Sequence, residues 1–230
     1  MCYNISIKSY PMEMEDLFRA RFEDSDEFVP YYHVSAFARP RIPVITNENP
    51  EVIQLLRWGF VPRWVKDEKQ AAEISQKTLN ARAETLFEKP SFREAIVQRR
   101  CLIPVNGFFE WKHENGKKYP YFIRLKDAPL FTLGGIWDEW INKGTGEIIK
   151  SFSIITTEAN SMMAQIHNTK MRMPLILSRD SGMTWLKNSL KAPEIRDLMK
   201  PFDEKKMEAY TVSIHQPNSN TPASIEKHQY

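Results

Sequence analysis

The sequence predicts an α+β fold whose core is a curved, barrel-like, mostly antiparallel sheet with helices at its margins. Short segments rich in apolar, β-branched and aromatic residues dominate the middle of the chain. Two turn signals lie between such segments, Asn115-Gly116 and the Gly-containing stretch 142–147, and both are typical of tight hairpins. Because hairpins join antiparallel neighbours, these signals argue against a doubly wound parallel sheet.

The expected strands are segments in which apolar residues alternate with polar ones or form a short continuous run. They cover residues 3–9, 42–46, 52–59, 101–105, 108–112, 119–125, 130–137, 148–157, 174–177 and 209–214. Several follow one another directly in the middle of the chain, as antiparallel strands joined by turns do.

The expected helices are shorter and peripheral. One helix face is predicted by apolar residues at helical spacing, namely Met14, Leu17, Phe18 and Phe22. Ser91 and Glu94 stand in capping-box register, which predicts a helix beginning near Ser91. Further helices are expected over residues 159–166, 181–190 and 192–199.

The chain has 230 residues, of which 42% are apolar, and this favours one domain over residues 1–214 with a polar tail over residues 215–230. It contains no apolar run long enough to cross a membrane and no signal-like start, so we expect a cytoplasmic protein, associated with the nucleoid when it is bound to DNA. The two cysteines, Cys2 and Cys101, match neither a disulfide framework nor a zinc-ligand spacing. No metal site is expected.

The net charge of +3 is too small to indicate a polyanion partner, but its distribution is informative. Residues 11–30 are acidic, whereas residues 36–64 carry arginines interleaved with Trp58, Phe60 and Trp64. Cations that hold phosphates and flat rings that stack on unpaired bases are typical of single-stranded nucleic acid binding. The alternative is that the tryptophans fill the core and the arginines surround it.

Cys2 directly follows the initiator methionine. If Met1 is removed, Cys2 carries an α-amine and a thiol on neighbouring carbons, and an aldehyde could bond to both. The amine would form an imine, and the thiol would then close a five-membered thiazolidine ring. The alternative is a small packed thiol, because cysteine is among the most buried residue types.

Three later segments accompany Cys2 in order: LNARAET at residues 79–85, PVNGFFEW at residues 104–111 and IHNTKMRMPLIL at residues 166–177. Together they resemble the SRAP family (SOS response-associated peptidase), the abasic-site processing proteins, over most of the chain. The resemblance implies a barrel-like antiparallel core, binding of single-stranded DNA that contains abasic sites, and covalent capture of the abasic sugar through Cys2. It also implies autocatalytic removal of Met1.

The resemblance also implies candidate site residues, at the positions of this chain that match the family motifs. Glu110, among aromatic residues, is expected to move protons, although strand alternation alone cannot say whether it faces a cleft or water. His167 titrates near neutrality and could open the sugar or assist loss of water. By resemblance Asn80 lies beside Cys2 and Arg82 contacts phosphate. Arg82 could instead form a salt bridge, Glu110 could be a solvated strand residue, and His167 could be a capping residue.

Arg39 and Arg172 are further phosphate candidates, while Trp58 and Trp64 are expected either to stack on bases or to pack in the core. The chain departs from the family pattern in two places. Tyr3 and Asn4 follow the cysteine where Gly-Arg is common. Residues 168–171 separate His167 from Arg172, where the usual pattern has a single residue, so the placement of Arg172 is an open question.

The expected reaction needs no metal and no diffusible cofactor, because the substrate itself is the electrophile. We expect a monomer. Two other functions stay open at this point. One is a cysteine-dependent peptidase or amidohydrolase that uses Cys2 and His167. The other is a non-catalytic module that binds single-stranded nucleic acid.

Overall fold

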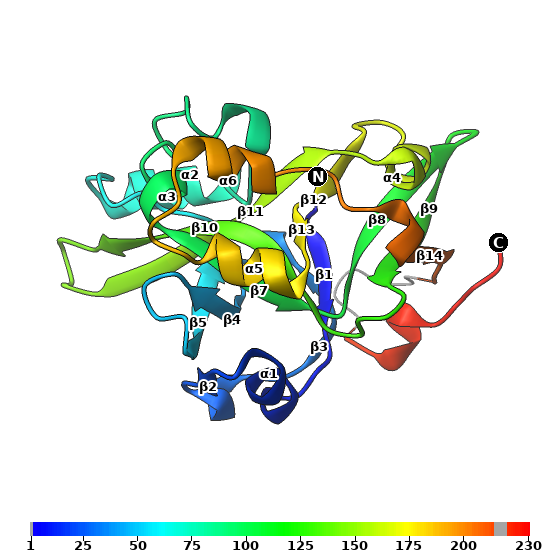
Figure 1. Cartoon of the computed structure of the whole chain (residues 1–230), viewed down its shortest axis with the longest axis horizontal. Coiled ribbons are helices and arrows are strands. Elements are labelled where there is room, and N and C mark those ends of the chain that lie inside the picture. The colour runs from blue at the N-terminus through cyan, green and yellow to red at the C-terminus, as the bar shows by residue number, and fades with distance from the viewer. Residues whose placement is uncertain (1, 214–219) are drawn as a thin grey trace.

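The structure is a computed structural model that describes residues 2–213 and 220–230 (Figure 1). The expectations for Met1, for the end of the last strand at residue 214 and for the start of the tail lie outside these ranges. Within them, no helix is long and apolar enough to cross a bilayer.

A closed five-stranded barrel forms the larger part of the molecule. Its strands are β4 (Arg41–Thr46), β5 (Val52–Trp58), β7 (Arg100–Val105), β10 (Phe131–Ile141) and β11 (Ile148–Glu158). The order β11-β10-β7-β4-β5 is antiparallel throughout, and β5 then returns to β11 in parallel, which closes the ring. The predicted barrel-like, mostly antiparallel core is therefore confirmed.

A second antiparallel sheet lies beside the barrel. Its order is β14 (Met207–Thr211), β9 (Lys117–Leu125), β8 (Gly107–Glu114), β1 (Asn4–Ile7) and β3 (Tyr31–Ser35). Figure 1 shows β8, β9 and β14 to the right of the blue β1 strand and the barrel strands to its left. The chain passes from the barrel to this sheet at Asn106, whose side chain accepts hydrogen bonds from the backbone N–H groups of Lys8 and Ser9.

Four short strands extend the barrel sheet. They are β2 (Arg21–Phe22), β6 (Asn80–Arg82), β12 (Arg172–Pro174) and β13 (Ile176–Leu177). β6 pairs in parallel with β11 and β12 pairs antiparallel with it, so both lie along the same long strand. This arrangement brings two of the sequence motifs together, although about ninety residues separate them in the chain.

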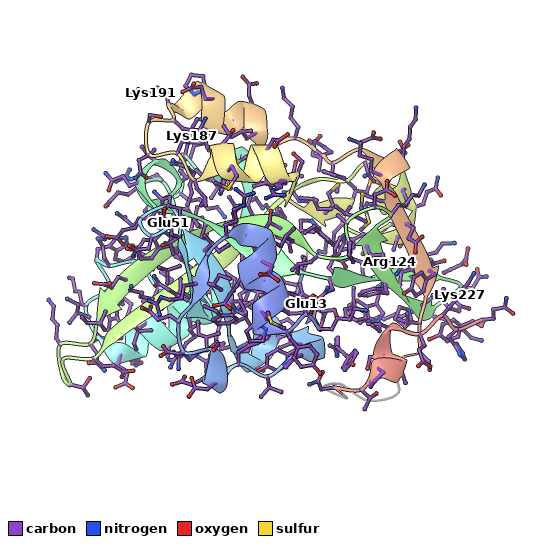
Figure 2. All side chains as sticks on the ribbon, turned by 60° about the horizontal axis from the view of Figure 1, so that its bottom comes forward. Glu13, Glu51, Arg124, Lys187, Lys191 and Lys227 are labelled. Carbon is purple, nitrogen blue, oxygen red and sulfur yellow. The ribbon has the colours of Figure 1, made fainter. Side chains whose placement is uncertain are left out.

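The helices cover the outside of the sheets. They are α1 (Pro11–Phe18), α2 (Glu68–Lys77), α3 (Ala95–Gln98), α4 (Ser161–Ile166), α5 (Arg179–Trp185) and α6 (Ala192–Leu198), with 3-10 turns at η1 (Ser25–Glu27), η2 (Ala36–Ala38), η3 (Ala83–Thr85), η4 (Glu204–Lys206) and η5 (Pro222–Ile225). Figure 2 shows charged side chains over the outside of the molecule, among them Glu13 of α1 and Arg124 of β9.

Three expectations for the helices need correction. Phe22 belongs to β2 and not to the first helix. The capping box at Ser91 does not form, because residues 90–94 make turns and α3 begins only at Ala95. Helix α2 was not expected, since it is largely polar, yet it begins at Asp67, whose carboxylate accepts a hydrogen bond from the Gln70 N–H.

Both predicted hairpins are confirmed. Asn115 and Gly116 have φ angles of 50° and 74°, as the two central residues of a type I′ turn require, and Glu114 pairs with Lys117. The stretch 142–147 joins Ile141 to its partner Ile148. These turns fix the registers of β8 with β9 and of β10 with β11. The register of β8 in turn decides where Glu110 lies.

Candidate active site

Cys2 lies where the β1 ladder with β8 begins. Asn4 pairs with Phe109 and Ile5 with Phe108, and the same register continued places Tyr3 opposite Glu110. The Cys2 side chain is 0% exposed. Burial raises the pKa of its thiol, and the charge of the neighbouring Glu110 raises that pKa further. The thiol is therefore protonated at neutral pH in the structure.

Glu110 points into the protein and not into water. Its side chain is 5% exposed, and its Oε1 lies 3.6 Å from Nδ1 of His167. Burial raises the pKa of the Glu110 carboxyl to about 7. A carboxyl with this pKa is present in both protonation states near neutral pH, so it can both give and take a proton.

His167 reaches Glu110 because helix α4, which ends at Ile166, packs against β8 (Figure 1). Its Nδ1 lies 2.9 Å from the carbonyl oxygen of Arg172. Since a carbonyl only accepts, Nδ1 is the donor, and Nε2 of the neutral ring is left as an acceptor. Burial lowers the pKa of His167 to about 4, so the ring is neutral at pH 7.

Asn80 and Arg82 lie on one face of the short strand β6, because alternate residues of a strand point to the same side. They pair in parallel with Ile154 and Thr156 of β11. Within the described ranges, neither amide atom of the Asn80 side chain has a hydrogen-bond partner, although both are buried. Such a group is costly unless a ligand completes it.

Arg82 is exposed and forms no ion pair with any residue that the structure describes. Its positive charge acts on the Tyr3 hydroxyl, which places the guanidinium near the residue that follows Cys2. An exposed cation beside the site can contact phosphate. The salt-bridge alternative is not found at this position.

Arg172 makes the ion pair instead. Its side chain is 11% exposed and donates to both carboxylate oxygens of Glu84, at 2.5 Å and 2.9 Å, and to the carbonyl oxygen of Thr156 at 2.6 Å. Burial acts to raise the pKa of Glu84, but the hydrogen bonds and charge of Arg172 lower it. Arg172 thus joins β12, β11 and the turn after β6.

The two tryptophans lie in different environments. Trp58 is fully buried, donates its Nε1–H to the carbonyl oxygen of Leu79 at 2.8 Å, and stacks on Phe152. The core-packing alternative therefore describes Trp58, because no face of its ring is open to a base. Trp64 is 47% exposed and keeps an accessible ring. Arg39 is exposed, and its guanidinium donates to Ser75 Oγ at 3.3 Å.

The four residues between His167 and Arg172 form a closed turn. The N–H of Met171 donates to the carbonyl oxygen of His167 at 2.8 Å, and Met171 has a φ of 50°. The side chain of Asn168 reaches across to His113 on β8. The longer loop is accommodated as a turn, and Arg172 still enters its strand opposite Glu158.

Sequence reasoning did not assign a role to several residues around the site. Glu84 and Thr156 hold Arg172, Asn168 contacts β8, and Phe37, 69% exposed, packs against Tyr3 with ring centroids 4.9 Å apart. The place of Glu84 in the segment LNARAET was a signal for that residue, and the unusual loop length was a signal for Asn168. The contacts of Thr156 and Phe37 depend on tertiary structure.

The described residues contain no group of three or more His, Cys, Asp or Glu side chains that could hold a metal ion. The site instead contains a buried thiol, a buried carboxyl and a neutral imidazole, beside the inner strands β1 and β8 of the sheet that adjoins the closed barrel. A thiol, a carboxyl and an imidazole are the kinds of side chain that nucleophilic and acid–base chemistry uses.

The comparisons give the particular family. The model of the SOS response associated peptidase (SRAP) family matches residues 1–217, and the chain belongs to this family. It is 40% identical over 212 residues to the abasic site processing protein YoqW of Bacillus subtilis (strain 168), covering 88% of this chain and 91% of that protein. It is 36% identical over 231 residues to the abasic site processing protein YoaM of the same strain, covering 98% of each.

A solved structure has the same fold. A protein from Bacteroides thetaiotaomicron superposes with a TM-score of 0.95 at 41% sequence identity, covering 99% of this chain and all of that one. The barrel, the second sheet and the peripheral helices therefore belong to a fold already seen by crystallography.

Proposed function

We propose that this protein processes abasic sites in single-stranded DNA by capturing the ring-opened sugar covalently through Cys2. The observation that carries the proposal is the convergence of Cys2, Glu110 and His167 at one end of β1 and β8. Membership of the SRAP family and the names of the relatives support abasic-site processing as the reaction.

The chemistry requires the mature chain to begin at Cys2. We propose that the protein removes Met1 itself, so that the α-amine of Cys2 becomes free. The amine nitrogen then bonds to C1′ of the open-chain aldehyde, and the carbonyl π electrons pass to oxygen, which takes up a proton to give a carbinolamine. Loss of one water molecule gives the imine. The thiol sulfur adds to the same carbon, and its proton passes to nitrogen, which gives a thiazolidine and releases no further group.

Glu110 and His167 supply the proton transfers. Protonated Glu110 gives a proton to the leaving hydroxyl of the carbinolamine, and its carboxylate takes one from the thiol, because its pKa of about 7 permits both states. The thiol needs such a base, since its own pKa is raised. Neutral His167 has Nε2 as a further acceptor, because its Nδ1–H donates to the carbonyl oxygen of Arg172.

The other residues would hold the DNA. The unpartnered amide of Asn80 fits the hydroxyl groups of the sugar or the amine of Cys2. Arg82 and Arg39 would contact phosphates, and exposed Trp64 would stack on a base. The guanidinium of Arg172 is already paired with Glu84. We therefore propose that Arg172 supports DNA binding indirectly, by holding β12 against the turn after β6.

The cysteine-dependent hydrolase is a weaker candidate for the main activity. Cysteine hydrolases attack with a thiolate, whose pKa is lowered by a neighbouring imidazolium or another positive charge. In this site both burial and the charge of Glu110 raise the pKa of Cys2. That arrangement suits a nucleophile that acts second, after an amine has already bonded to the carbon.

The proposal is tested with a single-stranded oligonucleotide that carries one abasic site. Wild-type protein should form an adduct that survives heating in denaturant, and the Cys2→Ala variant should form none, whereas Cys101→Ala should behave as wild type. Cys101 is a suitable control because it is a buried core thiol in β7. An adduct of undiminished yield with Cys2→Ala would contradict the proposal, and turnover of ordinary peptides without DNA would favour the hydrolase.

A further inference from the structure

The side chain of Asn168 fastens the turn between His167 and Arg172 to β8. The Oδ1 of Asn168 accepts a hydrogen bond from the His113 N–H at 3.1 Å, and its Nδ2 donates to the His113 carbonyl oxygen at 2.7 Å. A residue of a neighbouring antiparallel strand exchanges the same pair of bonds. The Asn168 amide therefore takes the place of a strand residue at this edge of β8.

The same edge of β8 carries β1. Asn4 pairs with Phe109, and alternate residues of a strand direct their backbone groups to one edge, so Phe109, Trp111 and His113 share it. Cys2 precedes the first residue of β1, Asn4, by two positions. Because β1 and β8 run antiparallel, the Asn4 end of their ladder is the end nearer to His113 and the Asn168 contact.

The contact also links the two elements that carry the acid–base pair. Asn168 is the next residue in the chain after His167, and His113 lies on the same strand as Glu110. Apart from the packing of α4 on β8, the two hydrogen bonds of Asn168 are a direct connection between these elements. The carboxyl and imidazole that they support are 3.6 Å apart.

We propose that Asn168 is a positioning residue that holds His167 against Glu110. This inference rests on the proposed function, because the pair matters only if it moves protons. Asn168 does not touch the reacting atoms in this account. Its loss would let the turn move away from β8, and water would then enter between the ring and the carboxyl.

The first test needs no DNA. The titration of His167 is followed by NMR of its ring carbons and protons in wild type, Asn168→Ala, Asn168→Gln and Thr169→Ala. The Glu110 carboxyl lies 3.6 Å from the His167 ring, and the charges of the N-terminal amine, His113 and Lys170 act on the pKa of that ring. All of these groups are kept in every variant. Thr169→Ala is the matched control, because Thr169 is exposed in the same turn.

The pKa of His167 should be near 4 in wild type and in Thr169→Ala. In Asn168→Ala it should rise by about one unit toward its ordinary value, since renewed contact with water favours the charged ring. Asn168→Gln keeps the donor and the acceptor and should restore much of the wild-type titration. If Asn168→Ala titrates as wild type does, the proposal is overturned.

The second test measures the rate of adduct formation on the abasic oligonucleotide. Asn168→Ala should react on the order of tenfold more slowly, because small displacements of catalytic groups are costly, while its affinity for undamaged single-stranded DNA stays unchanged. If wild type forms the adduct and Asn168→Ala forms it at the same rate, Asn168 is not a positioning residue for this reaction. If wild type forms no adduct at all, the proposed function fails, and the NMR titration still decides whether Asn168 positions His167.

Discussion

Strand alternation places Glu110 on the same face of β8 as Phe108 and on the opposite face from Phe109. The sequence could not say which face is inside, because β8 is buried on both faces over residues 107–110. Phe108 belongs to the main hydrophobic core, whereas Phe109 packs with Phe122 and Val212 in a separate cluster. The neighbours of Glu110 in the fold, and not its neighbours in the chain, raise the pKa of this carboxyl.

Burial of Glu110 makes stability depend on pH. Because the pKa is raised from 4.5 to about 7, the folded state favours the protonated carboxyl, so this contribution is fully present below about pH 4.5 and is lost as the pH rises through 7. Between those limits wild type should lose up to about 3 kcal/mol relative to Glu110→Gln. Urea unfolding at several pH values measures this difference. A constant difference between the two proteins across that range would show that the carboxyl is not desolvated in solution.

Arg82 differs from Arg172 in having no acidic partner among the described residues. If Arg82 contacts one phosphate, Arg82→Ala should weaken binding to single-stranded DNA and lower the slope of log K against log salt by about 0.7. Arg124→Ala is the control, because Arg124 is an exposed arginine that pairs with Glu208 on β14. Titration of a fluorescent oligonucleotide at several salt concentrations gives both slopes, and equal slopes for wild type and Arg82→Ala would exclude the phosphate contact.

At the scale of elements, the site depends on β11, which receives β6 on one side and β12 on the other. The hairpin turns and most strands of this region could be predicted, because their signals are local. The ion pair of Arg172 with Glu84, which links β12 to the turn after β6, could not be predicted, because it joins residues 88 positions apart. The helix α2 was missed for a different reason, since its sequence has almost no apolar face and its stability comes from Asp67 and from packing of Ala71.

The pair of Arg172 with Glu84 should be measurable as a coupling. Arg172→Lys keeps the charge but loses the two parallel hydrogen bonds, and Glu84→Gln removes the charge. Since Glu84 is partly exposed, we expect a coupling energy of roughly 1 kcal/mol in a double-mutant cycle of unfolding free energies. Additive effects of the two substitutions would mean that the pair does not join β12 to the turn after β6.

At the scale of the whole molecule, a closed barrel supports a smaller sheet whose β1 strand begins two residues after the proposed nucleophile. The antiparallel barrel was predictable from consecutive strands and their turns. Its closure was not, because β5 and β11 pair in parallel across almost a hundred residues. The roles of Cys2, Glu110 and His167 came from the family resemblance, whereas their proximity is a property of the fold.

The central claim is that the nitrogen and the sulfur of one N-terminal cysteine bond to a single sugar carbon. The most direct measurement is the intact mass of the protein before and after it reacts with a single-stranded oligonucleotide that contains one abasic site. The protein should lack one methionine residue, and the adduct should have the mass of protein plus oligonucleotide less one water, with no free thiol at Cys2. An adduct formed by a chain that retains Met1, or one in which the Cys2 thiol still reacts with alkylating reagent, would contradict that claim.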